Sequence, residues 1–142
     1  MAQFVTTIAS SVDPAAALAY MAAFENALDW DPSVTEARRV TAGDPRVGST
    51  FDLVARFGPR AVPLRYTITA LDDAHVVLEA RRPGFSSRDT ISVRAATGGS
   101  AVTYDALLEF HGIGRIADPL MGWIFGRVGR KAEVGLRRVL NP

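Results

Sequence analysis

The C-terminal stretch 118–140 carries the longest helical pattern in the chain and constrains the fold most strongly. Asp118 is a favourable N-cap and Pro119 a favourable first helical residue, because proline's missing N–H is not needed there. At about 100° per residue, the apolar side chains of this stretch fall on one arc of roughly 200°. They are Leu120, Met121, Ile124, Phe125, Val128, Ala132, Leu136, Val139 and Leu140. One face of the helix must therefore be buried, and the preceding chain has to supply the surface that covers it.

Five residues of this helix break the amphipathic pattern. Gly122, Gly126 and Gly129 lie together on one edge of the apolar arc, although each costs about 1 kcal/mol relative to alanine. They indicate a close backbone approach, room for a ligand beneath the helix, or simply tolerated flexibility. Trp123 and Val134 lie on the otherwise charged arc. This placement is compatible with an interface anchor or, for Trp123, with a ring that lies across a neighbouring loop.

Composition narrows the class of protein. The 142 residues suit one domain spanning 1–142, and 48% are hydrophobic, which is typical of a globular chain. Sixteen basic and fifteen acidic side chains nearly cancel, so no basic stripe argues for a nucleic-acid partner. The chain has no cysteine and no recognisable signal peptide, and its longest apolar run is too short for a membrane span. We therefore expect a cytoplasmic protein without disulfides.

The rest of the chain reads mostly as strands. Residues 3–10 are rich in β-formers, and Asp13-Pro14 then opens a short helical segment that the Trp30-Asp31-Pro32 sequence ends. Strand-like runs separated by Gly, Pro and Asp turn signals follow at 34–41, 49–57, 61–71, 75–82, 86–95 and 101–111. The short connections favour antiparallel neighbours. The sequence thus predicts an α+β fold: a curved antiparallel sheet around a long C-terminal helix, with two short helices after the first strand.

Alternation along the strands indicates which side chains face the covered side of this sheet. Phe51, Tyr66 and Tyr104 each share parity with apolar neighbours two residues away. Asp89 shares parity with Ile91, so it is expected to face inward, where a carboxyl group needs a partner. Tyr66, Tyr104, Arg81 or a ligand are the candidate partners. Asp89 is then either an internal hydrogen-bonded anchor or a functional group.

Several local patterns, together with the order of elements, resemble the SRPBCC superfamily, which contains the START and polyketide cyclase/dehydrase proteins. The patterns that carry the resemblance are Val12-Asp13-Pro14, Phe24-Glu25-Asn26, Trp30-Asp31-Pro32, Asp89-Thr90-Ile91, Val102-Thr103-Tyr104, Asp118-Pro119-Leu120 and Gly135-Leu136. The resemblance covers essentially the whole chain and implies a helix-grip fold. It also implies an apolar small molecule held between the sheet and the C-terminal helix, or a cyclase or dehydratase activity. Ser33 follows Pro32 where many relatives carry a bulky residue.

No catalytic constellation is evident in the sequence. His75 and His111 lack a nearby nucleophile and a second histidine at ligand spacing, so neither a metal site nor a cofactor is predicted. Asp89 is the weak catalytic candidate. Trp30 is expected at the rim of a pocket, or as a staple between the short helices and the sheet.

Three functional hypotheses remain open. The first is the binding of an apolar or amphipathic small molecule, such as a lipid, a polyketide or an aromatic compound, in a cavity under the C-terminal helix. Its predicted contacts are Trp30, Phe51, Tyr66, Asp89, Tyr104, Met121 and Phe125. The second is a cyclase or dehydratase with Asp89 as the acid–base group. The third is a subunit without a small-molecule ligand that forms a homodimer through Trp123 and Val134.

Overall fold

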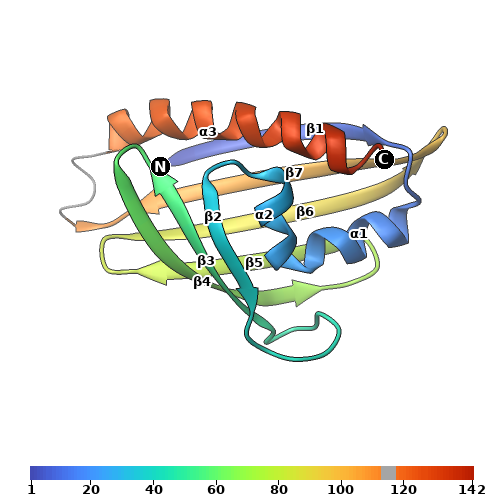
Figure 1. The fold of residues 1–142 in the computed structure, drawn as a ribbon, viewed down its shortest axis with the longest axis horizontal. Helices are drawn as coiled ribbons and strands as arrows, with labels where there is room; N and C mark the ends of the chain where they lie inside the picture. Colours follow the sequence, from blue (N-terminus) through green and yellow to red (C-terminus); the bar gives the residue numbers. More distant parts are fainter. Residues whose placement is uncertain (113–117) are drawn as a thin grey trace.

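The computed structural model of the chain describes residues 1–112 and 118–142, without the side chains of residues 118 and 119. The N-cap contact predicted for Asp118 therefore lies outside the described part. Figure 1 shows one strongly curved sheet with helices on its concave side. The strands are β1 (Ala2–Ser10), β2 (Val34–Arg39), β3 (Thr50–Phe57), β4 (Arg60–Leu71), β5 (His75–Arg82), β6 (Phe85–Ala96) and β7 (Gly99–Phe110). The helices are α1 (Pro14–Ala22), the 3₁₀ turn η1 (Phe24–Asn26), α2 (Ala27–Trp30) and α3 (Asp118–Val139).

The sheet is antiparallel throughout, with the strand order β1-β7-β6-β5-β4-β3-β2. Strands β3 to β7 follow one another through short turns, as the Gly and Pro signals predict, whereas the longer segment 40–49 connects β2 to β3. The last strand, β7, pairs with the first strand, β1, and places Val102 opposite Ile8. The predicted helix-grip architecture is confirmed, and the strand boundaries agree with the predicted ones to within two residues.

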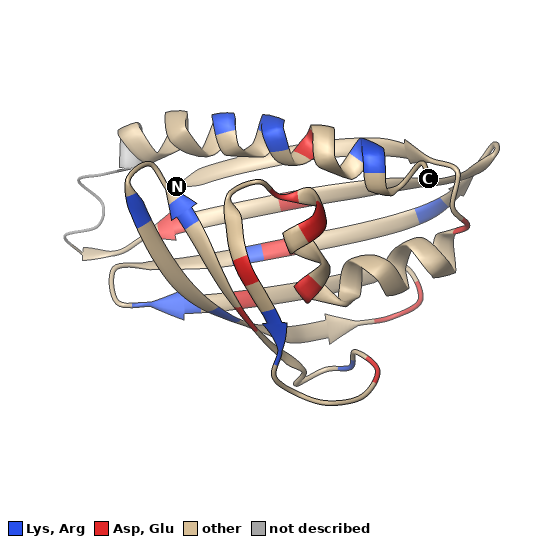
Figure 2. Ribbon diagram, in the orientation of Figure 1, with Lys and Arg blue, Asp and Glu red and all other residues tan. Residues whose placement is uncertain are grey.

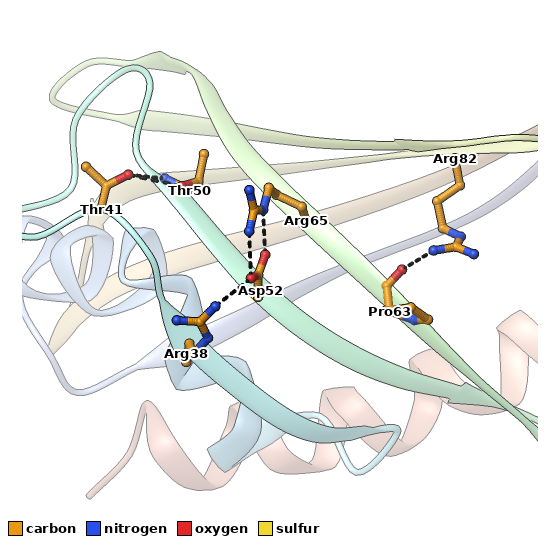
Figure 3. Close-up of polar contacts among 7 residues, drawn as sticks. All are labelled: Arg38, Thr41, Thr50, Asp52, Pro63, Arg65 and Arg82. Carbon is orange, nitrogen blue, oxygen red and sulfur yellow. Dashed lines mark hydrogen bonds and ion pairs between the residues drawn. The ribbon is translucent and has the colours of Figure 1, made fainter.

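The two faces of the sheet differ in chemistry, as the alternation predicts. On the outer face, Asp52 accepts two hydrogen bonds from Arg65, at 2.7 and 2.9 Å, and one from Arg38 at 3.1 Å (Figure 3). The Arg65 hydrogen bonds are the main reason that the pKa of the Asp52 carboxyl group lies below its usual value. The inner face carries the core, in which Phe51, Leu78 and Ile91 are fully buried.

The short helices α1, η1 and α2 pack against the concave side of the sheet at one end. Asp13 caps α1 by accepting a hydrogen bond from the Ala16 amide at 3.4 Å, and Pro14 is the first helical residue, as predicted. Trp30 ends α2 and is buried among the core aromatics. Its ring packs edge-on at 5.2 Å from Tyr104 and 6.3 Å from Phe24, measured between ring centroids. Trp30 is therefore the staple between helix and sheet, and the alternative of a rim residue at a pocket mouth is wrong.

The C-terminal half of α3 is firmly packed along β1 and α2 (Figure 1). Ala132, Leu136 and Leu140 are buried. Gly135 lies so close to α2 that an added Cβ atom would come within 1.9 Å of the Trp30 carbonyl oxygen. The close backbone approach suggested for Gly122, Gly126 and Gly129 is not found there, because an added Cβ atom at these positions would meet side-chain atoms or nothing. The close approach to another backbone occurs at Gly135 instead.

The N-terminal half of α3 is covered much less well. Leu120 is 61% exposed, so its predicted burial on the apolar arc is wrong. An added Cβ atom at Gly122 would meet nothing within 4 Å, whereas one at Gly129 would press on the Phe4 ring. Among the described side chains of this half, at positions 120–128, Phe125 alone is buried. The second half of α3 is therefore tightly packed against the rest of the protein, whereas most side chains of its first half are only partly covered.

Candidate functional site

A small cavity lies under the first half of α3, against the concave face of the sheet. Its volume is about 40 Å³, which accommodates a few water molecules at most. Phe125 and Val128 form its roof, and the apolar part of its floor comes from β3, β4 and β7. That part of the floor is Leu53, Ala55, Leu64, Ala106 and Leu108. The structure thus has a cavity at the predicted place, but the cavity is too small for a lipid or a polyketide, so the predicted ligand-sized space is not present.

Hydrogen-bonding side chains from three strands meet on the floor of this cavity. The Tyr104 hydroxyl donates to the Asp89 carboxylate at 2.8 Å, and the Ser87 hydroxyl donates to it at 3.4 Å. The hydroxyl groups of Ser87 and Tyr66 lie 2.9 Å apart. All four residues are buried and line the cavity. We name them the polar floor: Tyr66, Ser87, Asp89 and Tyr104.

The strand register explains why these groups meet. Ser87 and Asp89 are two residues apart on β6, so both point to the concave side, as do Ile91 and Val93 farther along. Tyr104 lies on the adjacent strand β7, opposite Ile91, from where its long side chain reaches back to Asp89. Among the partners considered for Asp89, the structure selects Tyr104; Arg81 is exposed instead.

The environment of Asp89 favours the protonated acid. Burial raises the pKa of its carboxyl group to about 7, with a further contribution from the nearby charge of Asp31. The hydrogen bonds from Tyr104 and Ser87 act in the opposite direction, because they stabilise the carboxylate. Burial also raises the pKa of both tyrosines of the polar floor well above the usual value, so they remain hydrogen-bond donors at neutral pH.

Asp31 is a second carboxyl group on the cavity wall, and in the sequence it stands out only as part of the Trp30-Asp31-Pro32 helix break. It follows α2 and accepts hydrogen bonds from the Ser33 amide at 2.9 Å and the Ser33 hydroxyl at 2.7 Å. Burial raises the pKa of its carboxyl group, while the Ser33 hydrogen bonds lower it. The Asp-Pro-Ser turn signal is visible in the sequence, but its position opposite the polar floor depends on the folding of α2 against the sheet.

The remaining predicted contacts occupy different surroundings. Phe125 lines the cavity. Met121 lies outside it, in a surface groove near β7. Phe51 is fully buried in the core, with the Arg39 guanidinium group 6.0 Å from its ring centre, and it does not reach the cavity. The site predicted from sequence therefore divides into four cavity residues, one groove residue and two core residues.

Two surface grooves flank the first half of α3 and share lining residues with the cavity. The β3 groove, of about 390 Å³, runs between Pro32 and Arg56 on one side and α3 on the other, and shares Ser33 and Val128 with the cavity. The β7 groove, of about 470 Å³, contains Met121 and Phe110 and shares Phe57 and Leu108. The cavity is therefore separated from each of the two grooves by side chains that line both.

The two histidines are not part of this site. His75 is exposed and its Nδ1 atom lies 3.1 Å from Asp72, while His111 Nε2 lies 3.3 Å from the Ser86 hydroxyl on the outer side. Within residues 1–112 and 118–142, no group of three or more His, Asp or Glu side chains is placed to hold a metal ion.

One known protein family matches almost the whole chain. The family described as "Polyketide cyclase / dehydrase and lipid transport" matches residues 1–141. The chain belongs to this family. The resemblance to the SRPBCC superfamily, which rests on scattered turn and strand patterns in the sequence, is thereby confirmed. Among curated proteins, no match is found.

Solved structures share the fold of this family member at low sequence identity. A Thermus thermophilus protein, TTHA0849, has a TM-score of 0.77 at 12% identity, covering 98% of this chain and 95% of that one. A START superfamily protein from Mycobacterium smegmatis has 0.72 at 11%, covering 97% and 94%. The Zhui aromatase/cyclase from Streptomyces sp. R1128 has 0.69 at 9%, covering 97% and 88%. No helix in the described part of this family member is long and apolar enough to cross a membrane.

Proposed function

We propose that the protein binds an apolar or amphipathic small molecule between the concave face of the sheet and the first half of α3. The observation that carries the proposal is the polar floor, a set of buried hydrogen-bonding groups that face an internal cavity instead of packed protein. Binding sites combine an apolar lining with a few polar groups that orient the ligand. The family match, which includes lipid transport, supports the same interpretation.

The cavity must enlarge before such a ligand fits, because small-molecule sites usually measure about 300–1,000 Å³. The first half of α3 is the element that would move. Leu120 is mostly exposed, Gly122 contacts nothing on its Cβ side, and the grooves on both sides already reach cavity residues. The second half, with its buried leucines, would stay on β1 and α2. Opening therefore requires only local separation of Phe125 and Val128 from the sheet.

A cavity-filling substitution tests the proposal. Ala106→Phe puts a ring into the floor, whereas Leu107→Phe places the same ring on the outer face of the same strand. We expect Ala106→Phe to reduce the affinity for the neutral fluorescent probe N-phenylnaphthylamine by at least about tenfold, because a ring and the probe compete for one space. Leu107→Phe should leave the affinity unchanged. Equal probe affinities in all three proteins, each folded by circular dichroism, would place the probe elsewhere and defeat the proposal.

A second candidate, a cyclase or dehydratase reaction in the same cavity, is favoured by the carboxyl group of Asp89. With a pKa of about 7, it is close to half-ionised at neutral pH and so can accept and return a proton. In a cyclisation with loss of water, it would accept a proton from a carbon next to a carbonyl and later donate one to the departing hydroxyl group. Asp89→Asn separates the candidates: it would abolish conversion of a linear poly-β-ketone while the substrate still binds.

A further inference from the structure

The β3 groove carries cationic side chains on both of its walls. Arg56 comes from β3, and Arg127 and Lys131 come from α3. Among the described residues, the lining contains no Asp or Glu, and none of the three cations forms an ion pair. All three are exposed. Figure 2 shows further Lys and Arg positions along α3, interrupted by an acidic one at Glu133, and others near the β3–β4 turn.

The groove is also partly apolar. Trp123 and Ile124 form part of its wall, and the Arg127 guanidinium group lies 5.2 Å from the centre of the Trp123 ring. Val128 lines both the groove and the cavity beneath it. Once the cavity has enlarged as proposed above, an elongated molecule could keep one end among the cations at the surface while its apolar body lies past Val128 in the interior.

The interior favours one orientation for such a molecule. Asp31 and Asp89 both line the cavity, and the described lining contains no basic side chain. An anionic group at the inner end would lose its hydration without meeting a basic side chain in the described lining, and burial of an unpaired charge is costly. The same anionic group in the groove would face Arg56, Arg127 and Lys131. The charge of the lining thus differs between the groove and the adjoining cavity, which share Ser33 and Val128.

We propose that the β3 groove binds the anionic head group, a carboxylate or a phosphate, of an amphiphile whose apolar body enters the cavity under α3. The inference rests on the proposed function, since it assigns the ligand class and the orientation at that same site. Guanidinium groups bind carboxylates and phosphates through paired hydrogen bonds, and a primary ammonium adds a point charge.

Three probes with the same hydrocarbon chain test the assignment by displacing N-phenylnaphthylamine: decanoate, decyl phosphate and decanol. We compare Arg56→Glu and Arg127→Glu, one from each wall, with the control Arg94→Glu. Arg94 is exposed on β6 away from both grooves, and its replacement changes the net charge equally. Each groove variant should weaken the binding of at least one anionic probe about tenfold and leave decanol within about twofold, because only the anion loses a favourable contact and gains a repulsive one. The control should alter none of the three.

The possible outcomes separate this inference from the proposed function. If decanol and the anions all bind the wild type but the groove variants affect none of them, or all equally, the head-group assignment is overturned and interior binding stands. If none of the three probes binds the wild type, both are overturned. Selective weakening of decanoate, or of decyl phosphate, supports the inference and identifies the head group as a carboxylate or a phosphate.

Discussion

The Asp89→Asn variant should gain stability relative to the wild type as the pH rises from about 4 to about 8. The folded protein holds the proton on Asp89 up to a pKa of about 7, whereas the unfolded chain releases it near the ordinary value of 3.8. Between these values the folded state binds more protons, so wild-type stability falls with rising pH, and the fall is complete above pH 7. The rise in pKa corresponds to about 4 kcal/mol, which is the upper limit of the relative gain.

Urea denaturation of both proteins at several pH values measures this difference, and carboxyl groups that do not interact with Asp89 cancel in the comparison. Tyr104→Phe provides a second measurement. Because the Tyr104 hydrogen bond lowers the pKa of Asp89, its loss should raise that pKa further and extend the pH range over which stability falls. If the free energies of unfolding of wild type and Asp89→Asn run parallel from pH 4 to 8, Asp89 is in contact with water and the described burial of the polar floor is wrong.

Trp30→Ala should destabilise the protein by about 3–5 kcal/mol, the usual cost of removing a buried aromatic ring. Trp30 is 2% exposed and packs against Phe24 and Tyr104, and its carbonyl oxygen lies against Gly135 of α3. The same substitution at Trp123, which is 61% exposed, should change the free energy of unfolding by at most about 0.5 kcal/mol. Urea denaturation of the two variants checks this pair. A small effect at Trp30, or a large one at Trp123, would reverse their structural assignments.

Local patterns account for most of what the sequence predicts correctly. Alternation correctly places Asp89, Tyr66 and Tyr104 on the covered face, because the side-chain direction along a strand depends only on parity. The Gly and Pro turns give the hairpins and hence most of the strand order. The helix-grip arrangement of the C-terminal helix follows from its apolar arc and from the family resemblance.

The features that the sequence does not predict correctly depend on contacts between segments that lie far apart in the chain. The helical wheel places Leu120 on the buried arc, since it assumes that the covering surface extends along the whole helix; in the structure only the second half of α3 is firmly covered. From the sequence, Trp30 could lie at the rim of a pocket or pack between the short helices and the sheet. The contact of its ring with Tyr104 shows the second arrangement. Asp31 reaches the cavity through the same packing. The homodimer through Trp123 and Val134 stays a prediction, with both side chains exposed on α3.

Intermolecular nuclear Overhauser effects between decanol and the methyl groups of the protein test the central claim most directly. The claim is that an apolar molecule enters the space between the sheet and the first half of α3. We predict cross-peaks from the decanol chain to Leu53, Leu108 and Val128, which line the cavity. At saturating decanol, cross-peaks confined to the exposed methyl groups of Val5 and Val134, or no cross-peaks at all, would contradict it.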